Sequence, residues 1–263
     1  WKLINKIYIK QEMHNMKNLA IIIIIISWMF GLTGDELVQK MDDRITPKDS
    51  KVDMVMTLTN KKGKTRESSL RSTTKDDGAK QIIWFLSPAD DKGVSFLKIE
   101  HDDKDDEMRM WLPAFKKIRR ISASKRSGSF MGSDMSYEDM STRQSNEFKF
   151  KIIGSEFFKD ASCYLLESKP KEHIRTEYGH HITWVDSTLF VPLKEESYDK
   201  MGKIIKEKYF NYTVINKYQI LTEIKVTNIQ KNHSTTLKFN NIELDRGVKD
   251  SYFHERYLKR LPK

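Results

Sequence analysis

Residues 110–140 carry the sequence MWLPAFKKIRRISASKRSGSFMGSDMSYEDM, which separates two series of alternating strands. The stretch begins as the apolar end of a strand, stopped by Pro113, and continues as a basic run. Ser127-Gly128-Ser129 follows, a linker that holds no fixed shape by itself. The remaining part is rich in large apolar side chains, namely Phe130, Met131, Met135, Tyr137 and Met140. Exposed on a loop they would promote aggregation, so we expect them to cover something.

Two interpretations fit this segment. It closes over the protein's own core, as most buried apolar side chains do, or it forms a lid over an apolar ligand. Arg119 and Arg120 end the preceding strand, and on a strand the two point to opposite faces. We expect one of them to pair with Asp134 or Glu138 and so to latch the lid. The alternative is that the arginines only solubilise the strand end or attract an anionic membrane.

Apolar and polar residues alternate on both sides of this stretch, with turn signals at roughly ten-residue spacing. Residues 51–59, for example, place Val52, Met54, Met56 and Leu58 on one face. We expect about eleven strands in one antiparallel sheet, which must curl to bury a face. The predicted fold class is mainly β (α+β): a single large curled antiparallel sheet that forms an incomplete β-barrel, with a few helices as plug or lid. No linker divides residues 32–263, so they form one domain.

Two helices are expected at the ends of this domain. Thr33 and Glu36 have the spacing of a capping box, and the apolar stripe after them predicts a helix over residues 35–44. Phe253 and Tyr257 stand four residues apart and predict a short helix over residues 251–258. Helices of this length cannot fill the inside of so wide a sheet, which leaves a cavity or a bulky lining.

The candidate lining is rich in methionine, which is flexible and adapts to ligands of varied shape, although it also fills gaps in ordinary cores. The predicted lipid-binding residues of the cavity and lid are Met54, Met56, Leu58, Trp84, Phe96, Met108, Met110, Phe130, Met131, Met135, Tyr137 and Met140.

Residues 1–31 have the pattern of a secretory signal peptide. Lysines precede the apolar run Leu19–Phe30, which is too short for a bilayer core that needs about 20 residues. The alternative is an N-terminal membrane anchor. The chain begins with Trp1, so translation is expected to start at Met13 or Met16, which would leave the first dozen residues untranslated. We expect an exported, periplasmic protein.

Charge and cysteine content limit the partners. The segment 1–31 holds four lysines and one glutamate, so the formal charge of +10 becomes +7 after its removal. That excess favours transient contact with a membrane surface. The basic residues are spread among nearly as many acids, so no nucleic-acid partner is expected. Cys163 is the single cysteine, which excludes an internal disulfide.

The sequence contains no specific catalytic or metal-binding motif. His180 and His181 are adjacent, and on a strand they point to opposite faces and cannot share a metal ion. The acidic run 102–107 lacks the spacing of a calcium loop and suits a solvated hairpin tip. H-E-x-x-H, G-x-S-x-G, C-x-x-C and the P-loop are absent. We therefore expect no enzyme, no cofactor and no metal.

Several motifs resemble those of the LolA-like outer membrane lipoprotein-sorting protein family. They are L-P-x5-R-R-I at 112–121, GSFMGSDMSYEDM at 128–140, LTGDEL at 32–37, FLSPADDKG at 85–93, and Trp184-Val185-Asp186 followed by Val191-Pro192. The resemblance extends over residues 32–263. It implies an incomplete antiparallel barrel with helices at its mouth, which carries lipid or acylated protein through the periplasm.

Two functions follow from this resemblance. The first is a soluble carrier that moves lipid or lipoprotein acyl chains between the inner and outer membranes. Such a carrier would load from an inner-membrane exporter, of the resistance-nodulation-division or ABC type. The second is a lipid-sensing regulator or adaptor of a membrane partner with the same fold.

Overall fold

The computed structural model describes residues 31–101 and 104–262. The expected signal segment, residues 1–31, lies outside these ranges except for its last residue. The first element is α2 (Gly34–Asp42), and the predicted capping box is formed. The backbone N–H of Thr33 donates to Glu36 Oε2 at 2.8 Å, and the backbone N–H of Glu36 donates to Thr33 Oγ1 at 3.2 Å. These bonds satisfy donors that a helix start otherwise leaves unpaired.

The strands form one antiparallel sheet in the order β6-β5-β4-β3-β2-β1-β13-β12-β11-β10-β9-β8-β7. Their bounds are β1 Asp49–Thr59, β2 Thr65–Lys75, β3 Lys80–Ser87, β4 Ser95–Ile99, β5 Glu107–Leu112, β6 Lys117–Arg120, β7 Phe148–Phe158, β8 Ala161–Pro170, β9 Tyr178–Asp186, β10 Pro192–Asp199, β11 Ile204–Ile215, β12 Tyr218–Asn228 and β13 His233–Leu244. Two series of hairpins, β1–β6 and β7–β13, are joined because β1 pairs with β13.

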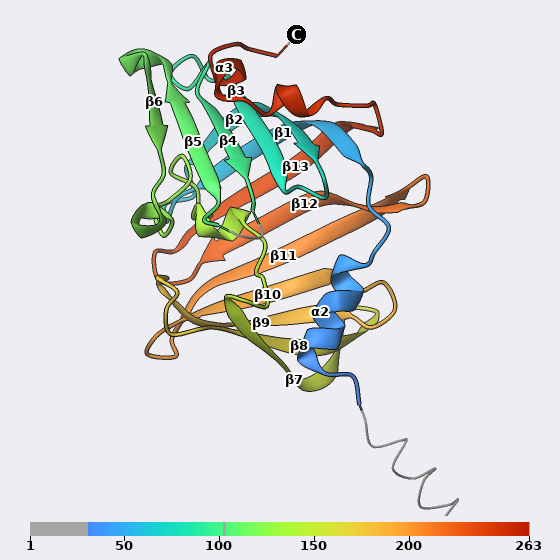
Figure 1. The fold of residues 1–263 in the computed structure, drawn as a ribbon. Helices are drawn as coiled ribbons and strands as arrows, with labels where there is room; N and C mark the ends of the chain where they lie inside the picture. The colour runs from blue at the N-terminus through green and yellow to red at the C-terminus, as the bar shows by residue number, and fades with distance from the viewer. Residues whose placement is uncertain (1–30, 102–103, 263) are drawn as a thin grey trace, which may run out of the picture.

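The sheet curls but does not close (Figure 1). β6 and β7 stand at the two ends of the strand order and do not pair with each other in the described part of the chain. This confirms the predicted incomplete barrel, with thirteen strands instead of about eleven. β6, with the sequence KIRR and one half-buried residue, lies where a strand before the lid was expected.

The outer face of β3–β5 is covered by the C-terminal segment, which contains η4 (Asp250–Tyr252) and α3 (Glu255–Leu258) (Figure 1). The predicted helix over residues 251–258 is therefore split in two. Phe253 and Leu258 pack on Ile82, Trp84 and Leu97. Because β3 is covered on both faces, its sequence is continuously apolar and does not alternate.

The inner face is covered by two elements. α2 packs Leu37 against Leu166 and Val185 at the β7–β9 end of the sheet. The connection between β6 and β7, residues 121–147, covers the other part, and we call it the lid segment. It contains η2 (Ala123–Lys125) and η3 (Glu138–Met140), while η1 (Pro113–Phe115) lies in the β5–β6 turn.

Candidate functional site

The lid segment packs its aromatic side chains onto the inner face of β3–β5. The ring centroid of Phe130 lies 5.3 Å from that of Phe96, 6.0 Å from that of Phe85 and 5.8 Å from that of Tyr137. Phe130 is 3% exposed, although it follows the flexible-looking Ser-Gly-Ser linker. A bridge between Ser129 and Ser136 closes the turn that carries it. In this structure the segment therefore closes over the protein's own apolar face.

Eleven of the twelve predicted lipid-binding residues belong to this inner cluster, because they are buried in it or packed against it. They are Met54, Met56, Leu58, Phe96, Met108, Met110, Phe130, Met131, Met135, Tyr137 and Met140. Trp84 was placed wrongly. It lies in the outer cluster and its Nε1–H donates to the carbonyl of Tyr257 at 3.3 Å. In the continuous apolar run of β3 no alternation indicates which residues face inward.

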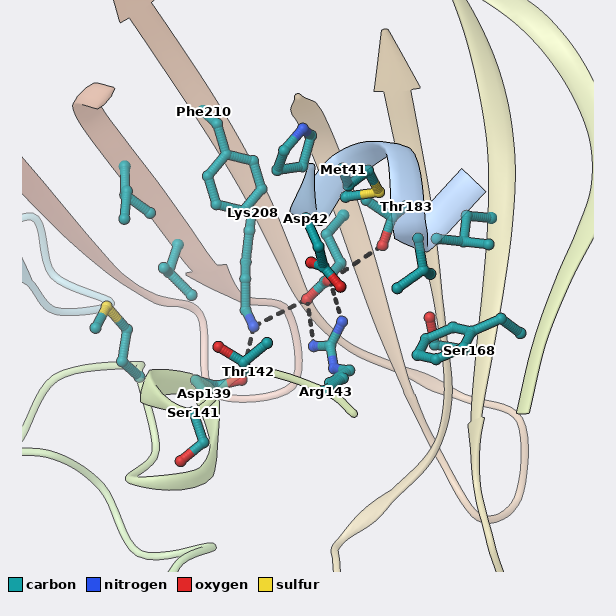
Figure 2. A pocket seen from close by; sticks show the side chains of 18 residues that line it. Met41, Asp42, Asp139, Ser141, Thr142, Arg143, Ser168, Thr183, Lys208 and Phe210 are labelled. Atoms are coloured by element: carbon teal, nitrogen blue, oxygen red, sulfur yellow. Dashed lines mark hydrogen bonds and ion pairs between the residues drawn. The ribbon is translucent and has the colours of Figure 1, made fainter. Parts of the chain in front are cut away.

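A cavity of about 260 Å³ lies between α2, the lid segment and the inner face of β7–β12 (Figure 2). Most of its wall is apolar, formed by Val38, Met41, Met135, Phe150, Leu166, Pro192, Phe210, Ile224 and Val226. Of the predicted residues, Met135 alone lines it. A second cavity of about 360 Å³ lies towards β1 and β13 and shares Pro192 with the first. Empty space thus remains on the inner face beside the packed cluster.

Ionised side chains form one end of the 260 Å³ cavity. Asp139 of the lid segment is bound by two lysines of β11: Oδ1 accepts from Lys208 Nζ at 2.6 Å, and Oδ2 accepts from Lys206 Nζ at 2.9 Å. The hydroxyl of Tyr178 also donates to this carboxylate, at 3.1 Å. Burial alone would raise the pKa of Asp139, but the adjacent Lys208 and Lys206 hold it well below its usual range. Asp139 is therefore ionised.

A second ion pair joins the lid segment to β10. Arg143 donates to both carboxylate oxygens of Glu195, at 2.6 and 3.0 Å, and Lys208 donates to Glu195 at 2.9 Å. Burial would raise the pKa of Glu195, yet Arg143 and Lys208 hold it well below the usual range. Burial and the neighbouring Arg143 lower the pKa of His181 well below its ordinary value, so this imidazole is neutral.

The expected latch between the arginines of β6 and the acids of the lid is not formed. Among the described residues, Arg119 and Arg120 make no ion pair with Asp134 or Glu138, and both are exposed. Arg119 pairs with Met110 across β5–β6, so it shares the inner face, whereas Arg120 pairs with Arg109. Only the expectation that the two arginines point to opposite faces is correct.

The two lid acids have other surroundings. The Asp134 carboxylate lies 2.7 Å from His233 Nδ1 and accepts from Thr235 Oγ1 at 2.7 Å, both on β13. Within the described part of the chain, Glu138 forms no ion pair with a cation, and its Oε1 is buried without a hydrogen-bond partner. Burial, opposed by a hydrogen bond from Thr176, raises the pKa of Glu138 to about 7. The lid is thus latched through Asp139 and Arg143, two residues that the sequence did not single out.

The sequence contained no clear signal for these residues. On β11, Lys206 and Lys208 share a face with Ile204 and Phe210, whereas Glu207 lies between Ile205 and Tyr209 on the other face, so both faces mix apolar and charged side chains. In the structure Ile205 is buried on its face, and both lysines are almost completely buried on the inner face. They tolerate burial because the carboxylates of Asp139 and Glu195 compensate their charges.

The described part of the chain contains no group of three or more His, Cys, Asp and Glu side chains arranged to hold a metal ion. None of the helices within residues 31–101 and 104–262 is long and apolar enough to cross a membrane.

Comparisons with known proteins identify relatives over most of the chain. A family model described as an uncharacterised protein matches residues 77–260. A domain assigned as an outer membrane lipoprotein-sorting protein from Vibrio parahaemolyticus is 30% identical, with a TM-score of 0.81, and the alignment covers 86% of this chain and 98% of that one. A DUF1329 family protein from Desulfovibrio piger is 31% identical, with a TM-score of 0.79 and coverages of 86% and 97%.

A LolA superfamily protein from Nitrosomonas europaea has the same fold, with a TM-score of 0.68 at 19% identity, over 86% of this chain and 100% of that one. No curated protein matches the sequence.

Proposed function

Because this chain belongs to the LolA-like outer membrane lipoprotein-sorting protein family, we propose that it is a periplasmic carrier of lipid or of lipoprotein acyl chains. The carrier takes an acyl chain on the inner face, under the lid segment, and moves it between the inner and outer membranes. The observation that carries this proposal is the 260 Å³ cavity with an apolar wall beside a lid made of methionine and aromatic side chains.

Cavity size supports a lid that moves. Ligand pockets for small molecules measure about 300–1,000 Å³; the cavity of about 260 Å³ falls just below that range and the neighbouring one of about 360 Å³ near its lower end. A whole acyl chain enters when the lid segment shifts away from the inner face. The methionines beneath it, Met54, Met56, Met108 and Met110, then become available to the chain, and their flexible side chains adapt to it.

The energetics suit exchange with a bilayer. Burial of an acyl methylene contributes about 0.8 kcal/mol, so a chain of about 14–16 carbons gains on the order of 10 kcal/mol. This free energy is similar to the free energy that the acyl chain loses on leaving a membrane. Transfer in either direction is therefore close to neutral. An inner-membrane exporter, of the resistance-nodulation-division or ABC type, is the proposed source of the cargo, and contact with membrane surfaces is transient.

Mass spectrometry of lipid that co-purifies with the protein from the periplasm tests the proposal. We expect stoichiometric lipid on the native protein and much less on an Ile224→Trp variant, in which the indole fills the cavity. Lys225→Trp is the matched control, because Lys225 is the next residue on β12 and is exposed. A native protein that carries no lipid, and binds neither neutral nor anionic lipid when delipidated, would refute the carrier function.

A further inference from the structure

The carboxylate of Asp139 occupies a site on the sheet that is built for an anion. Its two oxygens bridge the ammonium groups of Lys206 and Lys208, at 2.9 and 2.6 Å, and Tyr178 donates to it from β9. The cations and the tyrosine belong to the sheet, whereas the carboxylate belongs to the lid segment. Asp139 is 2% exposed and the lysines 5% and 7%, so the site is almost completely buried.

Movement of the lid segment changes the charge balance of this site. Asp139 and Arg143 leave with the lid, which removes one negative and one positive charge from the inner face. The sheet keeps Lys206 and Lys208 against the single carboxylate of Glu195, and His181 beside them is neutral. Glu177 lies 3.9 Å from Lys206 but is 41% exposed. Two neighbouring lysines that have lost their bridging anion attract another anion.

The anion site opens directly into the apolar cavity. Lys208 and Asp139 line one end of it, with Val226 opposite Lys208 on β12, while Phe210 and Met41 lie towards the other end (Figure 2). Ile224 is the partner of Phe210 on β12. Among the described residues, the cavity wall holds one carboxylate besides Asp139 and Glu195, that of Asp42, which lies exposed at the end of α2. On β11 the order Lys206, Lys208, Phe210 therefore runs from the anion site into the apolar wall.

We propose that the ligand is a long-chain amphiphile with a compact anionic head, a carboxylate or a phosphate, which replaces Asp139 between Lys206 and Lys208. This inference rests on the proposed carrier function and specifies its cargo. Asp139 is the internal competitor: in the closed form it fills the head-group site and holds the lid down. A bound anionic head takes over both lysines, so Asp139 is released and the lid stays open while the acyl chain lies on the inner face.

Calorimetric titration of the delipidated protein with oleate and with oleyl alcohol tests this proposal, because the two ligands share a chain and differ in the charge of the head. We expect oleate to bind at least tenfold more tightly. Lys208→Met should remove most of this preference, measured as the ratio of the two affinities in the same variant. Lys225→Met, on the exposed side of the neighbouring strand, is the matched control and should keep it.

Asp139→Asn provides a test with the opposite sign. Loss of the internal competitor should strengthen oleate binding severalfold more than binding of the alcohol, which gains only from the loosened lid. Inorganic phosphate alone should not compete with oleate at equal concentration, since it lacks the chain. Equal affinities of the native protein for oleate and the alcohol would overturn the proposal and leave the carrier function standing. A preference that survives in Lys208→Met would also overturn it, and a protein that binds neither ligand would refute both proposals.

Discussion

Asp139→Asn is also the sharpest test of how the lid is held in the absence of ligand. The substitution keeps the size of the side chain and removes the charge that compensates Lys206 and Lys208. Removing one partner of a buried ion pair destabilises a protein by about 3–5 kcal/mol. The asparagine carbonyl can still accept one of the two hydrogen bonds, so we expect the lower end, about 3 kcal/mol.

The expected effect is large enough to measure by thermal unfolding. For a domain of this size, 1 kcal/mol corresponds to about 2–4 °C in Tm, so Asp139→Asn should lower Tm by roughly 6–12 °C. Hydrogen exchange followed by mass spectrometry should show the largest gain in the lid segment. Exchange in β1–β3 should rise less, because these strands keep their pairing when the lid opens.

Asp250→Asn is the matched control for this experiment. Asp250 also bridges two lysines, Lys75 at 2.8 Å and Lys80 at 2.6 Å, but its side chain is 64% exposed. Water screens such a pair, so its loss should leave Tm nearly unchanged. If Tm fell by the same amount in the two variants, burial would not strengthen the Asp139 network. The lid would then be held by apolar packing alone.

Three further outcomes are expected. Glu138→Gln should raise Tm at pH 8 and change it little at pH 4. The raised pKa of about 7 means that the folded protein favours the protonated acid, so stability is lost as pH rises from about 4.5 towards 7; an unchanged pH profile would contradict this. Arg119→Ala and Arg120→Ala should leave Tm within about 1 °C of the native value, since both side chains are exposed; a larger fall would revive the expected latch. Met56→Ala should destabilise by about 2–5 kcal/mol in denaturant unfolding, because Met56 is buried in the inner cluster, and a loss below 1 kcal/mol would show that the cluster relaxes around it.

Local patterns were enough to predict the fold class. The capping box of Thr33 and Glu36 and the alternation of Met54 and Met56 depend on residues close in sequence, and both are formed as expected. The same patterns placed the apolar lid residues on the inner face, because Phe130 and its neighbours have no other surface on which to be buried. The family was recognised from motifs, at residues 128–140 and elsewhere, that resemble those of lipoprotein-sorting proteins.

The tertiary structure alone decided the chemistry of the site. Asp139 meets Lys206 and Lys208 across 67 and 69 residues, and no local rule relates these positions. β11 buries its lysines because the register with β10 places Lys208 near Glu195 while the lid segment brings Asp139 over both. Trp84 faces outward because α3 covers that side of β3. In each case burial depends on what a distant segment supplies, since a buried charge is stable only beside a compensating one.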